Sequence, residues 1–168
     1  MASTHRLPAE VSVLFERDSA GALPPLRPQR PYSAEAKSAI ADSTLATPLR
    51  GALHLLNDDL DAAHNLVQTD EGTPLSDLVH AVLHRREGDF WNSKWWLDRI
   101  SPALLTTLYA NGRAGAKRFV DDVERITSKG TATACAAQRD VADAKEWQWK
   151  ELVSIAKHAC KEYNVELP

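Results

Sequence analysis

The sequence predicts an all-α protein, a single-domain bundle of five or six helices. Ser/Thr-Pro pairs mark three helix starts, at Thr47-Pro48, Thr73-Pro74 and Ser101-Pro102. The hydroxyl oxygen can accept a hydrogen bond from a free N–H of the first turn, and proline has no N–H to leave unpaired. Few segments alternate apolar and polar residues with a period of two, so little or no sheet is expected.

The apolar periodicity predicts six helices, because glycine or Asn-Gly follows most of the periodic stretches and can adopt the left-handed conformation that ends a helix. These stop signals are Gly72, Gly88, Asn111-Gly112 and Gly130. Short connections favour antiparallel neighbours in a bundle. The predicted helices cover about 48–69, 74–87, 93–99, 102–110, 115–128 and 136–164.

Residues 1–45 differ in composition from the rest, which divides the chain into a leader and an all-helical domain over 46–168. Four prolines fall within the stretch GALPPLRPQRPYS. Proline fixes φ and lacks a backbone donor, so this part is expected to be an extended, Pro-rich segment that is partly disordered or wraps the domain surface. Its short apolar run, Val11–Phe15, is the part expected to dock.

Length and composition indicate a soluble globular protein. The 168 residues suffice for one domain with its own core, and 43% are hydrophobic and 26% charged. The net charge of −3 and the lack of a basic block argue against a nucleic-acid partner.

No apolar run approaches the roughly 20 residues that span a bilayer. Cys135 and Cys160 lack a disulfide or zinc spacing, so a cytoplasmic location is expected, and the oligomeric state is left open.

Polar side chains interrupt the apolar faces of three predicted helices. Asp59 lies in the apolar arc of the first, Arg86 one turn past Val82 on the second, and Gln148 near the centre of the last arc. A charge in such a place needs a partner or a shifted pKa. We expect one buried network, in which Asp59 and Arg86 pair; an ion pair that only fixes helix register is the plainer alternative.

Histidines at helical spacing predict a polar site between the first two helices. His80, His84 and Glu87 follow the spacing i, i+4, i+7, and HxxxH places two imidazoles on one side of a helix, where they can share a divalent metal. Zn, Mn or Fe would suit such a site, and Asp61 is the expected third ligand. Surface histidines and a solvated face of the first helix are the plainer alternative. Further candidates on the first helix are His54, Asp58 and His64.

The same residues also suit acid–base catalysis without a cofactor. A histidine beside a carboxylate is a general acid–base pair, and His64 and Asp59 would complete the set formed by His80, His84 and Glu87. Basic and aromatic residues that follow could hold a small anionic substrate. These expected substrate-binding residues are Arg85, Arg86, Asn92, Lys94 and Trp91.

A non-catalytic binding domain is the second hypothesis. Trp91, Trp95 and Trp96 lie in the stretch FWNSKWW, which could be presented to a protein or ligand. Burial in the core is the plainer interpretation, because aromatic side chains remove the most area from water.

Two motifs resemble those of a family of small all-helical proteins from bacteria and fungi. The first is DDLDxxHxxxQ and the second is HxxxHRRExDxxNxK followed by an aromatic pair. The segments FVDDVER, Phe119–Arg125, and EWQWKEL, Glu146–Leu152, are also similar. The resemblance covers about residues 49–160 and implies one functional unit, but no activity, cofactor or partner. The matching residues are Asp58, Asp59, Asp61, His64, Gln68, His80, His84, Arg85, Arg86, Glu87, Asp89, Asn92 and Lys94.

Overall fold

The computed structural model describes residues 5–128 and 134–167, which form nine α-helices, one short 3-10 helix and two two-residue strands. The all-α fold class is therefore confirmed, although the helices outnumber the five or six expected. The expected stop at Gly130 lies outside the described residues, and so does the Cys135 side chain. The helices are α1 (Ala9–Ser12), α2 (Ala34–Asp42), α3 (Thr47–Leu56), α4 (Leu60–Val67), α5 (Pro74–Glu87), α6 (Phe90–Arg99), α7 (Pro102–Leu108), α8 (Gly112–Ser128) and α9 (Ala134–Glu162).

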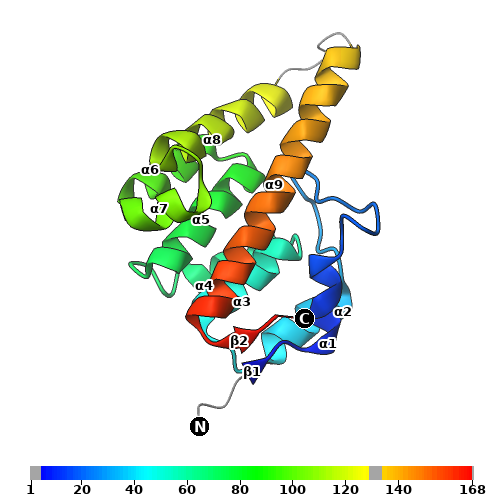
Figure 1. The fold of residues 1–168 in the computed structure, drawn as a ribbon, viewed down its shortest axis with the longest axis vertical. Helices are drawn as coiled ribbons and strands as arrows, with labels where there is room; N and C mark the ends of the chain where they lie inside the picture. Colours follow the sequence, from blue (N-terminus) through cyan, green and yellow to red (C-terminus); the bar gives the residue numbers. More distant parts are fainter. Residues whose placement is uncertain (1–4, 129–133, 168) are drawn as a thin grey trace.

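The long helix α9 runs the length of the molecule (Figure 1). In this view α5–α8 lie to its left, and α1 and α2 lie to its right. Helix α3 contacts α4, α5 and α9, and α5 also packs against α6. This arrangement places α3 and α5 at the centre. All twelve residues from Leu75 to Arg86, polar and apolar alike, are buried, so α5 is covered on every face.

The helix expected over 48–69 is two helices. The chain breaks at Asn57–Asp59, where Asp58 has φ 60°, in the left-handed region that Asn and Asp tolerate better than most residues. A continuous helix cannot pass through such a residue, so α3 ends at Leu56 and α4 starts at Leu60. The break lets α4 turn back against α3, which it contacts.

The expected helix starts differ in how they are capped. The Ser101 side chain accepts a hydrogen bond from the Leu104 N–H, as expected, whereas Thr73 is the N-cap of α5 without a side-chain bond. Thr47 lies inside α3, and Ala46 is the N-cap. The expected stop at Gly88 is confirmed, with φ 94° at the C-cap of α5.

The described part of the leader contributes to the core and is not extended throughout. It forms strand β1 (His5–Arg6), α1, the 3-10 helix η1 (Val13–Phe15) and α2. Strand β1 pairs in parallel with β2 (Val165–Glu166), so the segment that precedes α1 lies beside the segment that follows α9. The core includes Val11, Leu14 and Ile40 of this part of the chain. In the described residues, no helix is long and apolar enough to cross a membrane.

Candidate metal centre

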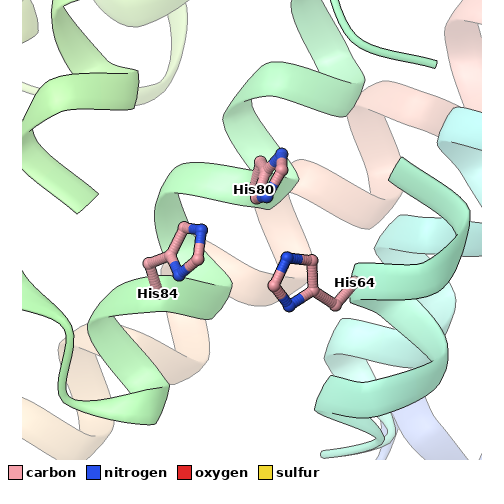
Figure 2. Close-up of side chains that lie close together, drawn as sticks. All are labelled: His64, His80 and His84. Atoms are coloured by element: carbon pink, nitrogen blue, oxygen red, sulfur yellow. The ribbon is translucent and has the colours of Figure 1, made fainter. Parts of the chain in front are cut away.

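Helices α4 and α5 bring three histidines together. His64 comes from α4, and His80 and His84 come from α5. Each offers one ring nitrogen, and these nitrogens lie within 4.8 Å of one another. Figure 2 shows the three imidazoles around one space between the two helices. The structure thus unites the HxxxH pair with His64, which the sequence placed among several candidates.

The local geometry follows from helix spacing and from the break at Asp58. Residues four apart lie on the same side of a helix, so the rings of His80 and His84 stack with centroids 4.8 Å apart. The His64 ring meets them edge-on, with centroids 4.9 and 5.1 Å away. Because α4 is a separate helix packed on α5, the His64 ring can face α5 while part of it stays exposed.

Glu87 fixes the orientation of two of the rings. Its Oε2 lies 3.0 Å from His84 Nδ1, and its Oε1 lies 3.5 Å from His64 Nδ1. A carboxylate accepts, so Nδ1 of each ring carries the proton and Nε2 keeps its electron pair. His84 Nε2 accepts from Asn92 Nδ2 at 3.2 Å, which agrees with this tautomer. Burial raises the pKa of Glu87, but the hydrogen bond from His84 and the charges of both histidines outweigh it, and the net pKa is lowered.

His80 forms the buried wall of the cluster. Its side chain is 4% exposed and its ring stacks on Trp96, with centroids 4.1 Å apart. Burial, and then the charges of His84 and His64, lower the pKa of His80 to about 4. The ring is therefore neutral near pH 7, the form that can donate electrons to a metal. Its Nδ1 is buried and has no hydrogen-bond partner among the described residues.

The opposite wall is open. The side chains of His64 and Glu87 are 32% and 30% exposed, whereas that of His84 is 7% exposed. Bonds of about 2.1 Å to a tetrahedral metal place the nitrogens roughly 3.4 Å apart, so small movements of the rings would complete a three-nitrogen site. The cluster offers three ring nitrogens, a carboxylate beside them and access from one side.

Two expected substrate-binding arginines are held in buried ion pairs. The Arg85 guanidinium binds Glu151 with both terminal nitrogens, and Glu151 also accepts from Tyr109 at 2.7 Å. Arg86 binds Asp58 and donates to the Leu55 carbonyl at 2.7 Å. Both guanidinium groups are engaged in buried ion pairs, so an anionic substrate would have to displace Glu151 or Asp58 to bind them.

The other expected substrate-binding residues also have different surroundings. Lys94 pairs with Asp121 at 2.5 Å and Glu124 at 3.4 Å, so its charge is neutralised. Trp91 is 74% exposed. Of the five expected substrate-binding residues, Asn92 is the one that contacts the histidine cluster, through His84. Of the four consecutive residues His84–Glu87, the first and last belong to the histidine cluster. Arg85 and Arg86, between them, belong to two separate buried ion pairs.

The two predicted aspartates, Asp59 and Asp61, are not at the cluster. Asp59 is buried beside His54, with Oδ2 3.2 Å from His54 Nδ1, and it also pairs with Lys37 at 3.4 Å. It does not pair with Arg86; that partner is Asp58, which binds Arg17 at 2.8 Å as well. Asp61 is exposed and lies outside the three-histidine group.

Gln148 belongs to the Arg86 network, as expected. Its Nε2 and the Arg86 guanidinium both donate to the Pro25 carbonyl, at 3.0 and 3.3 Å. The predicted network is therefore confirmed only for Arg86 and Gln148, because Asp59 is not among their partners. It also includes Pro25 of the leader, which the sequence offered no reason to place there.

Some functional neighbours were missed from the sequence. His54 was one of the further candidates for the cluster, but it is 2% exposed and pairs with Asp59 instead. Glu151 lies next to Leu152, in the apolar arc of α9. A polar residue in an apolar arc is the same signal that singled out Gln148, so Glu151 could have been found in this way. The stacking of Trp96 on His80 has no sequence signal, since it depends on how α6 packs on α5.

Comparison of the chain with protein-family models, curated proteins and solved structures gave no match. The resemblance in the DDLDxxHxxxQ and HxxxHRRExDxxNxK motifs therefore stays a prediction.

Proposed function

We propose that the protein is a small metal-dependent enzyme in which His64, His80 and His84 hold one divalent transition metal. The observation behind this is the convergence of the three rings, with ligand nitrogens within 4.8 Å of one another. Imidazole nitrogens suit Zn, Fe, Co, Ni and Cu, and His80 is already neutral at physiological pH. Glu87 acts as the carboxylate that orients the ligands through their Nδ1 atoms.

Three histidine ligands support catalysis better than a structural role. Structural zinc sites are closed by four protein ligands, whereas catalytic sites have three and leave a position for water or substrate. A metal held there lowers the pKa of bound water and polarises carbonyl or phosphoryl oxygens. The exposed side of His64 and Glu87 is where water and substrate would enter.

The test is elemental analysis of the untagged full chain after loading with zinc, manganese or iron and removal of excess metal. We expect about one metal per chain, lost on chelation, and lost in His64→Gln, His80→Gln and His84→Gln. His158→Gln is the matched control, because His158 is half-buried on α9 and pairs with Glu162, away from the cluster.

Circular dichroism of each variant separates loss of a ligand from loss of the fold. Folded His64→Gln that keeps the metal of the unsubstituted chain would contradict the proposal, as would a chain that binds none of the three metals. Glu87→Gln should weaken metal binding about 10–100-fold without abolishing it, which is the range for residues that orient ligands.

A binding role for the Trp-rich loop is the second candidate, supported by the exposure of Trp91. This indole is 74% exposed at the start of α6, where Trp95 is also exposed. Large exposed aromatic side chains are enriched at protein interfaces. Trp91→Ala should leave metal content unchanged, and loss of a partner on this change would favour the second role.

A further inference from the structure

A small pocket adjoins the candidate metal centre. Its volume is about 270 Å³, and Glu87 is one of its lining residues. Asp61, another lining residue, precedes His64 by one helical turn on α4. The pocket therefore meets the cluster at Glu87, and none of the three histidines lines it. Residues 28–31 of the Pro-rich segment and residues 58–61 form its walls, with Arg86 and Glu87.

Most charges in this pocket are already neutralised. Asp58 accepts from Arg17 and Arg86, which are both buried. Asp59 pairs with Lys37, and the Glu87 carboxylate contacts the rings of His64 and His84. A substrate that met these groups would have to compete with buried ion pairs, which is costly for either charge. They shape the pocket and do not select the charge of its ligand.

Two charged lining residues differ from the rest. Arg30 and Asp61 are exposed, and neither makes an ion pair with another described residue. One comes from the Pro-rich segment and the other from the first turn of α4, so they belong to different walls. The pocket thus presents one available guanidinium and one available carboxylate.

We infer that the pocket binds a small zwitterion of the amino-acid type, with its carboxylate on Arg30 and its ammonium group on Asp61. A molecule with only a negative charge would be repelled by the Asp61 carboxylate, and a molecule with only a positive charge would be repelled by the Arg30 guanidinium. The volume lies just below the usual range for ligand pockets, about 300–1,000 Å³, which restricts the ligand to a small molecule. That this zwitterion is the substrate of the metal centre rests on the proposed function.

The experiment uses three probes that differ by one charged group: L-alanine, propionate and ethylamine. Each is titrated into the full chain by calorimetry, with zinc loaded and with zinc removed. We expect L-alanine to bind at least about tenfold more tightly than either single-charge probe, since one charged contact is worth about that factor.

Variants assign the two contacts. Arg30→Gln should weaken L-alanine binding about tenfold and leave ethylamine unchanged, and Asp61→Asn should weaken it similarly and leave propionate unchanged. Arg139→Gln and Asp42→Asn are matched controls, because both residues are exposed and neither lines this pocket. Neither control should change binding.

The outcomes separate this inference from the metal proposal. Equal binding of the three probes, no binding of L-alanine, or no effect of Arg30→Gln and Asp61→Asn would overturn the zwitterion assignment. Metal content measured on the same samples after titration tests the metal centre independently, and also shows whether L-alanine removes zinc by chelation.

Discussion

Asp58 occupies the most constrained position in the molecule. Its φ of 60° breaks the helix between α3 and α4, and its carboxylate lies between two buried guanidinium groups, those of Arg17 and Arg86. Asn adopts left-handed φ about as readily as Asp, so Asp58→Asn removes the charge without backbone strain.

Asp58→Asn should therefore cost about 3–5 kcal/mol of unfolding free energy, because it leaves buried guanidinium charges without compensation. Chemical denaturation measures the loss. Asp42→Asn, on the exposed C-terminal end of α2, should stay within about 0.5 kcal/mol of the unsubstituted chain. A similar small change for Asp58→Asn would show that the ion pairs contribute little.

Tyr109 and Arg85 show a second buried network at the residue scale. Burial and the neighbouring Glu151 carboxylate raise the pKa of Tyr109 well above its usual value, so the phenol stays protonated and donates to Glu151. The Arg85 guanidinium also lies over the Phe119 ring, 4.5 Å from its centroid. This network joins α5 to α9 and explains why Arg85 takes no part in the histidine cluster.

At the scale of elements, the close approach of α3 and α4 depends on Gly51. A Cβ atom at Gly51 would lie 2.7 Å from Val67 Cγ1, which is a buried and stiff side chain. Alanine is the better helix former by about 0.5–1 kcal/mol, but overpacking a core costs about 1–3 kcal/mol. The cost of overpacking should therefore exceed the gain in helix propensity.

Gly51→Ala should thus destabilise the protein by roughly 1–2 kcal/mol, although glycine is ordinarily unfavourable within a helix. A double-mutant cycle with Val67→Ala checks the cause. If the contact is responsible, the double variant should be more stable than the sum of the single losses predicts, by more than about 0.5 kcal/mol. Strict additivity would place the effect of Gly51→Ala elsewhere.

At the scale of the whole molecule, the leader and the helical bundle share one core. Leu14 is fully buried, and the Pro25 carbonyl accepts from Arg86 and Gln148. The β1–β2 pairing adds a contact between the two ends of the described chain. The stability of the bundle should therefore depend on residues well before its first long helix.

Leu14→Ala should lower the unfolding free energy by about 2–5 kcal/mol, the usual cost of a cavity at a buried leucine. The neighbouring Val13 is 42% exposed, so Val13→Ala is a matched control that should change stability by less than about 0.5 kcal/mol. Thermal unfolding followed by calorimetry should show a single transition for both. An unchanged midpoint for Leu14→Ala would mean that the leader unfolds separately.

Local signals were enough for part of the fold and part of the candidate site. The start at Ser101, the stop at Gly88 and the i, i+4 spacing of His80 and His84 all act within one helix, where backbone geometry alone sets the outcome. Asp59 is buried as expected, but its predicted pairing with Arg86 was wrong. A helical wheel assumes a continuous helix, and the chain breaks one residue earlier, at Asp58.

The sequence by itself determined the all-α class, the HxxxH pair and the presence of buried charges, because these follow from periodicity and residue type. Only the tertiary structure decided which partners they meet. It brought His64 and not Asp61 to the pair, Asp58 and not Asp59 to Arg86, and Glu151 to Arg85. Each of these contacts joins residues from different elements, so it depends on how the elements pack, which no local pattern encodes.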